Sequence, residues 1–301
     1  MAEPKPDPGP PVNRVPVPVD TRAPGGTTNA YVAGGLLVDP AARTDALDAA
    51  VGVGGGTDGG PSDGEPGAAG VDAIAVTHTH PDHVGAVAAY ADRADAPVFA
   101  HADHVDRFVA ATGVEPDGTF AGGERVGDTP VRAVDTPGHA PDHVAFAVGR
   151  VREDGRGDGR GGDDGENPPG VLLCGDLAVA EGSVAVGAPE GDLRGYLDSL
   201  ERVRDAGYDR LYPGHGPVID DPRGVCDRLI EHRLDRERAV LAAVEAGASD
   251  VDGVVDRAYE KDLSGVADLA RTTVVAHLEK LFAEGRIDGE WADRLGRERG
   301  K

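Results

Sequence analysis

Three histidines and one aspartate stand within six residues of one another, between a predicted strand and a predicted helix. The apolar run 71–76 is bounded by turn residues, which predicts a strand, and apolar residues at helical spacing begin at Val84. The sequence THTHPDH fills positions 77–83 between them. Side chains alternate with period two at the end of a strand, so His78 and His80 point the same way and can reach one metal ion.

Asp82 and His83 fall in the first turn of the helix that follows, and they face the space beside it. The motif therefore supplies ligands for two metal positions. Imidazole and carboxylate without thiolate are the ligands of catalytic zinc sites that leave a position open for water, and they also suit iron and manganese. A polar turn without metal is disfavoured, because buried imidazoles at this density would be left unsatisfied.

Three further polar residues each follow a short apolar strand and stand beside glycine. His139 follows the run 131–134, Asp176 follows the run 171–174, and His215 follows a short Leu-Tyr pair. Open α/β architectures collect ligands where strands end, so we expect all three residues in the same site.

These residues, in this order, resemble the metallo-β-lactamase superfamily of binuclear metallohydrolases over roughly residues 25 to 220. The HxHxDH motif is present in full, and the later histidine, aspartate and histidine follow in order. Asp39, at the end of an apolar strand, resembles the superfamily's early structural aspartate. Four segments are similar to the glyoxalase II and β-lactamase-like protein 2 branch, namely TPGHAPDH, CGDLAVAEGSVAVGAPEGDLRGYLDSL, YPGHGPVI and EHRLDRER. Members of the latter group carry a C-terminal winged-helix-like module.

The resemblance implies an α/β fold, a four-layer αβ/βα metallo-β-lactamase sandwich with a small C-terminal helical, winged-helix-like domain. It also implies two divalent metal ions at one edge of the facing sheets, with zinc expected and iron or manganese as alternatives. The implied ligands of the first ion are His78, His80 and His139, those of the second are Asp82, His83 and His215, and Asp176 bridges both.

The expected chemistry follows from two cations about 3.5–4 Å apart, which lower the pKa of a shared water molecule to about 7 and so form a metal-bound hydroxide. Asp82 is expected to act in catalysis as a proton acceptor as well as a ligand. His143 lies four residues after His139, and it is either a residue that holds a ligand in place or an ordinary strand residue.

Composition changes along the chain and predicts three parts. Residues 1–24 form a Pro-rich N-terminal segment, residues 25–222 the metallo-β-lactamase-fold catalytic domain, and residues 223–301 a linker helix with the winged-helix-like module. Helical spacing dominates after Ser249, where the apolar runs typical of strands stop. Before that point strands are predicted over 71–76, 97–100, 131–134, 144–148 and 171–174, and a hairpin is predicted at Gly34-Gly35. The Gly-rich stretches 52–70 and 152–170 are expected to be surface loops.

The net charge of −24 disfavours sequence-independent electrostatic binding to nucleic acid phosphates, although a local basic patch is compatible with it. Abundant carboxylates with very few lysines are typical of a halophilic protein. The two cysteines suggest neither a disulfide framework nor a thiolate zinc site. We expect a cytoplasmic protein, since no secretion signal and no run of about 18 apolar residues is present.

The leading functional prediction is hydrolysis of an ester or thioester in a small acyl substrate, as in hydroxyacylglutathione hydrolase. The C-terminal region lacks the basic, substrate-gripping end of true glyoxalase II, so the acyl carrier stays open. One alternative is a single-strand endoribonuclease of the β-lactamase-like protein 2 type, with RNA as partner. Another is a non-catalytic winged-helix regulator that binds nucleic acid. Di-iron electron-transfer relatives carry glutamate where this chain has His80. A helical cap or a homodimer contact also accounts for the C-terminal pattern.

Overall fold

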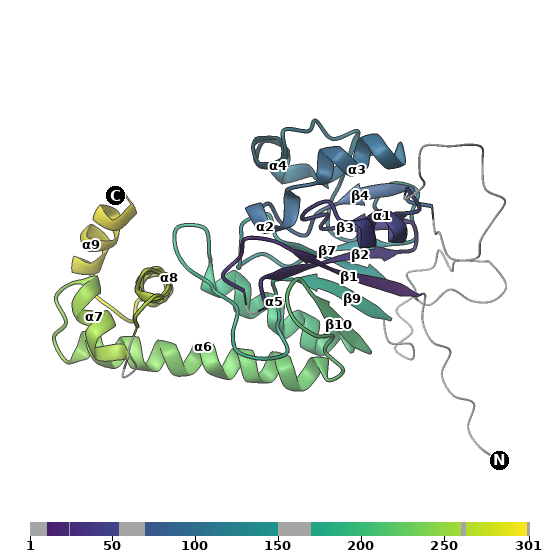
Figure 1. Cartoon of the computed structure of the whole chain (residues 1–301). Coiled ribbons are helices and arrows are strands. Elements are labelled where there is room, and N and C mark those ends of the chain that lie inside the picture. The colour runs from purple at the N-terminus through teal and green to yellow at the C-terminus, as the bar shows by residue number, and fades with distance from the viewer. Residues whose placement is uncertain (1–10, 24, 54–69, 150–169, 260–262, 300–301) are drawn as a thin grey trace, which may run out of the picture.

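Two four-stranded sheets face each other at the centre of the molecule (Figure 1). This computed structural model describes residues 11–23, 25–53, 70–149, 170–259 and 263–299. The first sheet contains, in spatial order, β1 (Val12–Pro18), β2 (Thr27–Ala33), β3 (Leu36–Val38) and β4 (Ala73–Ala75). The second sheet contains β10 (Arg210–Pro213), β9 (Val171–Gly175), β8 (Val144–Val148) and β7 (Arg132–Asp135). A parallel pair, β5 (Phe99–His101) and β6 (Gly118–Phe120), joins the first sheet through a bridge between Ile74 and Val98.

Alternating side chains along the strands divide the core into layers. In β9, Leu173 packs between the two sheets with Tyr31 and Phe146, whereas Leu172 and Cys174 face the helices outside the second sheet. Those helices are α5 (Leu193–Ala206) and α6 (Pro222–Glu245). The helices outside the first sheet are α1 (Asp45–Val51), α3 (Val87–Ala94) and α4 (Val105–Thr112). The order helix, sheet, sheet, helix confirms the predicted αβ/βα sandwich.

Two short helical elements complete the catalytic part, namely α2 (Pro81–Val84) and the 3-10 helix η1 (Ala102–His104). The predicted strands around 71–76, 97–100, 131–134, 144–148 and 171–174 are present as β4, β5, β7, β8 and β9. The hairpin expected at Gly34-Gly35 is present, because β2 and β3 pair antiparallel across it and both glycines have positive φ.

The fold begins earlier than predicted. Strand β1 pairs with β2 over seven residues, so the range assigned to the Pro-rich segment 1–24 contains a strand of the first sheet. Pro16 and Pro18 are tolerated because β1 lies at the edge of the sheet, where a missing N–H breaks no second ladder. Val15 and Val17 alternate into the core, which holds the strand in place. Positions 1–10 lie outside the described residues, as does most of each Gly-rich stretch.

The C-terminal part is helical, as predicted. After α6 come α7 (Val251–Ala258), α8 (Ala267–Ala283) and α9 (Glu290–Arg299), and residues 222–259 and 263–299 contain no strand. Asp221 caps α6 by accepting a hydrogen bond from the Gly224 N–H, and Asp250 caps α7 in the same way from Gly253.

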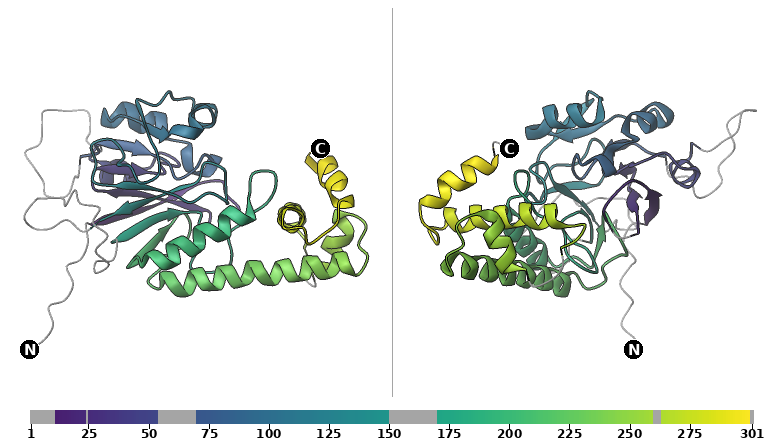
Figure 2. Two further views of the ribbon diagram at one scale, coloured as in Figure 1. Left: turned by 180° about the vertical axis from the view of Figure 1, so that it is seen from behind. Right: turned by 60° about the vertical axis from the view of Figure 1, so that its left-hand side comes forward.

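Helix α6 belongs to both parts of the molecule. Its first half packs on α5 through Cys226 and Leu229, and its far half carries α7 and α8, so one apolar cluster continues from Leu172 in β9 to Trp291 in α9. Figure 2 shows α6 running from beneath the second sheet to the C-terminal helices. Within the described ranges, no helix combines the length and the apolar character needed to cross a membrane.

Candidate metal centre

Asp39 organises the loop that carries the histidine motif. Its side chain is fully buried; Oδ1 accepts a hydrogen bond from the Thr77 N–H at 2.6 Å and Oδ2 one from the Thr77 hydroxyl at 2.8 Å. Asp39 Oδ2 also lies 3.0 Å from Nδ1 of His83. The backbone of Asp39 itself has φ of 52°, so it turns the chain sharply after β3. One buried carboxylate thus fixes both ends of the segment between β4 and α2.

The first group of possible ligands is His78, His80 and His139. Nε2 of His78 lies 2.9 Å from Nδ1 of His80, and Nε2 of His139 lies 3.0 Å from the same atom. The three nitrogens therefore lie within 4.8 Å of one another, beyond the ends of β4 and β7.

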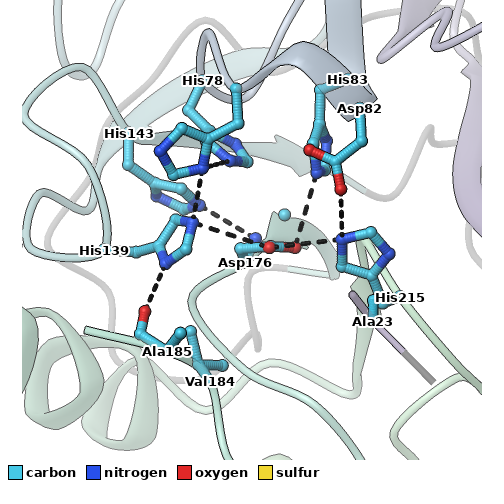
Figure 3. Close-up of polar contacts among 12 residues, drawn as sticks. Ala23, His78, Asp82, His83, His139, His143, Asp176, Val184, Ala185 and His215 are labelled. Atoms are coloured by element: carbon cyan, nitrogen blue, oxygen red, sulfur yellow. Dashed lines mark hydrogen bonds and ion pairs between the residues drawn. The ribbon is translucent and has the colours of Figure 1, made fainter. Parts of the chain in front are cut away.

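The second group is Asp82, His83 and His215, which come from α2 and from the loop after β10. Oδ2 of Asp82 lies 3.6 Å from Nε2 of His215. Figure 3 shows Asp176 between this group and the first, with His139 on one side and His83 and His215 on the other. The distances from Asp176 oxygens are 3.6 Å to His139 Nε2, 3.4 Å to His215 Nε2 and 3.8 Å to His83 Nε2.

The residues fit divalent cations. Nε2 of His83 and Oδ1 of Asp176 are buried and have no hydrogen-bond partner. Such atoms cost free energy unless a hydrogen bond or a metal ion satisfies them. His78, His83 and Asp176 also form a third group whose donor atoms lie within 4.8 Å of one another. Nitrogen and oxygen donors without sulfur suit zinc, iron and manganese.

Each histidine in the two groups has its other ring nitrogen held from outside. Nδ1 of His139 donates to the carbonyl oxygen of Ala185 at 2.7 Å, and Nδ1 of His215 donates to that of Thr27 at 2.9 Å. Such contacts fix the tautomer and the orientation of metal-binding imidazoles. The remaining contacts are His83 Nδ1 with Asp39, His78 Nδ1 with the Thr77 hydroxyl at 3.1 Å, and His80 Nε2 with Glu190 at 3.0 Å.

His143 is buried beside the ligands and supports one of them. Its Nε2 accepts a hydrogen bond from the Asp176 N–H at 3.1 Å, and its Nδ1 lies 2.9 Å from the carbonyl oxygen of Thr136. Burial lowers the pKa of His143 to about 3, so the ring is neutral and can accept that bond. Of the two readings open from the sequence, these contacts favour a residue that holds a ligand in place.

The charges of the centre are mutually dependent. Burial alone would raise the pKa of Asp176, but the hydrogen bond from His215 and the neighbouring His83 and His139 lower it below its usual value. Burial likewise opposes a charge on His83, yet the Asp39 carboxylate raises the pKa of His83 to about 9. The ionised Asp176 thus places negative charge between the two groups, where cations would bind.

Four residues of the site were not predicted from the sequence. Glu190 contacts His80, and Arg107 donates to Glu190 Oε2 at 3.0 Å and to Asp142 Oδ1 at 3.0 Å. The Thr21 hydroxyl donates to Asp82 Oδ2 at 2.6 Å. Asp142 stands inside the TPGHAPDH segment and Glu190 inside the CGDLAVAEGSVAVGAPEGDLRGYLDSL segment, so both belong to segments that resemble the family. Arg107 and Thr21 stand in segments without a recognised motif.

Comparison with known proteins decides the family. The model of the metallo-beta-lactamase superfamily matches residues 23–153. The chain is 30% identical over 239 residues to the beta-lactamase-like protein 2 homolog of Drosophila melanogaster, covering 73% of this chain and 71% of that protein. The chain belongs to the metallo-beta-lactamase superfamily. Proteins of this superfamily are generally hydrolytic metalloenzymes, and this chain is a metallohydrolase of that kind.

Two further similarities bear on the superfamily assignment. The crystal structure of a metallo-beta-lactamase family protein from Thermus thermophilus is similar with a TM-score of 0.63 and 25% identity, over 91% of this chain and 94% of that one. The atrochrysone carboxyl ACP thioesterase of Aspergillus fumigatus is 30% identical over 165 residues, which are 55% of this chain and 41% of that protein. The chain therefore spans less than half of the thioesterase, whereas it spans most of the Drosophila protein, which supports the predicted branch.

Proposed function

We propose that this chain is a binuclear, zinc-type hydrolase that cleaves an ester or thioester bond of an acyl substrate. The observation that carries the proposal is the position of Asp176, whose carboxylate lies between two separate groups of three possible ligands. Two divalent cations, when bound, supply Lewis acidity and the activation of water.

The protein residues have separate tasks in this proposal. His78, His80 and His139 hold one cation, while Asp82, His83 and His215 hold the other. Asp82 also accepts a proton, because its side chain is 18% exposed and is reached by the Thr21 hydroxyl. Asp176 stays ionised between the two groups, since His215 lowers its pKa.

The ester or thioester reading is supported by the similarity to a protein named as an acyl carrier protein thioesterase. It also agrees with the high negative charge of the chain, which disfavours the binding of polyanionic substrates such as RNA. The intact ligand groups support a hydrolase over a non-catalytic regulator.

A second candidate is a single-strand endoribonuclease. The Drosophila relative, of which this chain spans 71%, is named beta-lactamase-like protein 2 homolog. The ribonuclease alternative comes from the resemblance to that branch. The same centre would then act on phosphorus in place of an acyl carbon. A helical C-terminal part near the site would contact the RNA as a winged-helix-like module.

The test compares metal-loaded wild type with an Asp82→Ala, His83→Ala double variant in high potassium chloride. An acyl thioester and a single-stranded RNA are assayed in parallel, after circular dichroism has shown that the variant is folded. The proposal expects thioester turnover that falls at least about 100-fold in the variant. If the wild type cleaves RNA but not the thioester, and the double variant does not cleave RNA, the second candidate is established. Thioester turnover that is unchanged in the variant would refute hydrolysis at this centre.

A further inference from the structure

A small pocket of about 270 Å³ lies between α6, the start of α8 and the segment 183–185. Its charged lining comes from α6, and Tyr259, the residue after α7, also contributes a polar side chain. The residues that line it are Ser183, Val184, Ala185, His232, Arg233, Arg236, Tyr259, Leu263, Val266, Leu269, Ala270 and Thr273. No residue proposed above as a metal ligand lines this pocket, so it is distinct from the metal centre.

Three arginines of α6 lie at and beside this pocket, and within the described residues their hydrogen bonds go to carbonyl oxygens and not to carboxylates. Arg228 donates to the carbonyl oxygens of Val179 and Gly182, Arg233 to that of Val184, and Arg236 to that of Ala258. Among the described residues none of these three arginines forms an ion pair, although acids outnumber bases by 24 in the chain. The patch is therefore locally positive in a strongly negative protein.

Arg233 is the most unusual of the three. The residue is 3% exposed, and its Nε is buried with no hydrogen-bond partner. Its guanidinium lies 5.7 Å from the ring centre of Tyr196, which compensates part of the charge. Burial lowers the pKa of Arg233. A buried cation without a counter-charge costs free energy, so an anion in this pocket would be strongly favoured.

The charges of Arg233 and Arg236 also act on two neighbouring histidines. Burial and then Arg233 and Arg236 lower the pKa of both His232 and His277. His277 is buried next to these groups, and neither of its ring nitrogens has a partner. Arg236 lies 3.8 Å from the ring centre of Tyr259, an arrangement that fixes the direction of its guanidinium.

One wall of the pocket is also a support of the metal centre. Ala185 lines the pocket, and its carbonyl oxygen accepts the hydrogen bond from His139. The same segment is tied to α8 through the Ala188 N–H, which donates to the Thr272 carbonyl oxygen at 3.1 Å. The segment that contains Ala185 thus connects the pocket with the metal centre.

We propose that this pocket binds a phosphate group of the molecule that is hydrolysed at the metal centre. The link to hydrolysis rests on the proposed function, whereas the phosphate site itself rests on Arg233 and Arg236. The phosphate belongs either to the carrier of an acyl thioester or to a nucleotide of single-stranded RNA, and both present the same charged oxygens to the two guanidinium groups.

Arg236→Gln is the test variant, and Arg238→Gln is its control. Arg238 lies on the same helix, is 67% exposed and pairs with Asp235, so both variants lose one positive charge but only one loses it from the pocket. An Arg236→Lys variant retains the charge and tests rescue.

The kinetic measurement compares an acyl-coenzyme A thioester, which carries phosphates, with the neutral acyl N-acetylcysteamine thioester. In Arg236→Gln, kcat/KM for the charged thioester should fall about tenfold, mainly through KM, while the neutral thioester is unaffected. Arg236→Lys should recover part of the loss, and Arg238→Gln should match wild type. If RNA is the substrate, the KM for RNA should rise in Arg236→Gln alone. Equal losses for charged and neutral thioesters, or no loss for any phosphate-bearing substrate, would overturn the proposal.

A structural measurement separates this inference from the proposed function. Crystals of metal-loaded, full-length protein are soaked in sodium selenate, and an anomalous selenium peak between Arg233 and Arg236 is expected in wild type and in Arg238→Gln. The peak should be absent in Arg236→Gln. If the wild type hydrolyses neither thioester nor RNA, the proposed function fails, while the selenate result still decides the anion site. No peak in wild type would refute that site.

Discussion

Glu190 follows His80 by 110 residues in the chain, yet its Oε2 lies 3.0 Å from Nε2 of that imidazole. Nδ1 of the same ring faces His78 and His139, so Glu190 holds the ring from the side opposite to the first group of ligands. Arg107 holds Glu190 in turn, because its Nη2 donates a hydrogen bond to Oε2 of Glu190 at 3.0 Å. The hydrogen bond from Arg107 lowers the pKa of Glu190, and this effect is larger than the opposing effect of burial.

Replacing Glu190 with alanine should weaken metal binding in the first group. Carboxylates that orient metal-binding histidines are typically worth 10- to 100-fold in affinity, so the Kd of the first metal should rise by about that factor. Competition with a chromogenic chelator measures this without an activity assay. Glu181→Ala, an exposed glutamate in the same loop, is the control. Equal Kd values for the Glu190 variant and wild type would show that Glu190 does not position His80.

Replacing Asp39 with asparagine should destabilise the fold. Asp39 is fully buried and accepts two hydrogen bonds from Thr77, and it also pairs with His83. An amide keeps one acceptor oxygen and places a donor against His83 or Thr77, so the free energy of unfolding should fall by about 1–3 kcal/mol. Urea denaturation measures the change, and Asp45→Asn on the exposed start of α1 should leave it within about 0.5 kcal/mol. A neutral effect of Asp39→Asn would contradict its role in ordering the motif loop.

Glu237 ties α6 to α8 and to the turn after it. Its carboxylate lies 2.6 Å from Nζ of Lys280 and 2.8 Å from Arg286, and the Lys280 side chain is 9% exposed. Glu237→Ala should lower the free energy of unfolding by about 3 kcal/mol, because it leaves Lys280 buried with less counter-charge. Glu231→Ala, at an exposed position of α6, is the control. If α6 joins both parts into one cooperative unit, the unfolding transition measured by Trp291 fluorescence and the one measured by circular dichroism should coincide and shift together in the variant. Two separate transitions would contradict a single cooperative unit.

His277 should make stability depend on pH. Burial lowers its pKa to about 3, with Arg233, Arg236, Lys280 and His232 adding to the effect. The unfolded chain takes up this proton below about pH 6.5, whereas the folded chain does not until about pH 3. The stability due to the neutral ring is therefore complete above about pH 6.5 and is lost progressively as the pH falls toward 3.

His277→Leu should remove that dependence. Between pH 7.5 and 5.0, wild type should lose about 2 kcal/mol more in free energy of unfolding than the leucine variant. At pH 7.5 the variant should be at least as stable as wild type, because two unpartnered buried nitrogens are gone. His104→Leu controls for the removal of a histidine elsewhere. Parallel pH profiles for wild type and His277→Leu would exclude His277 as the source.

The sequence predicted the parts of the fold and site that depend on neighbouring residues. His78 and His80 share a face because of strand geometry, and β4, β8 and β9 follow from short apolar runs between turn residues. His139, Asp176 and His215 are assigned to the same place because each follows a strand, and the resemblance agrees. In the structure Asp176 lies beside His83, His139 and His215, and His215 lies beside Asp82.

Features made by distant contacts could not be predicted in this way. Glu190 and Thr21 reach the site across 110 and 61 residues, and although Glu190 stands in a segment that resembles the family, nothing in the sequence pairs it with His80. Strand β1 was hidden by its prolines, which are acceptable only because the strand lies at a sheet edge, a property of the assembled sheet. Arg233, whose buried Nε has no hydrogen-bond partner, likewise looks in the sequence like any other arginine of an amphipathic helix.

The most direct test of the binuclear centre is the metal content of wild type beside Asp176→Asn, measured by mass spectrometry after equilibration with zinc and removal of free ions. Wild type should retain two equivalents of zinc per chain, and Asp176→Asn should retain at least one fewer, because Asp176 lies between both groups of ligands. Wild type that retains one equivalent or none under these conditions would contradict a binuclear hydrolase.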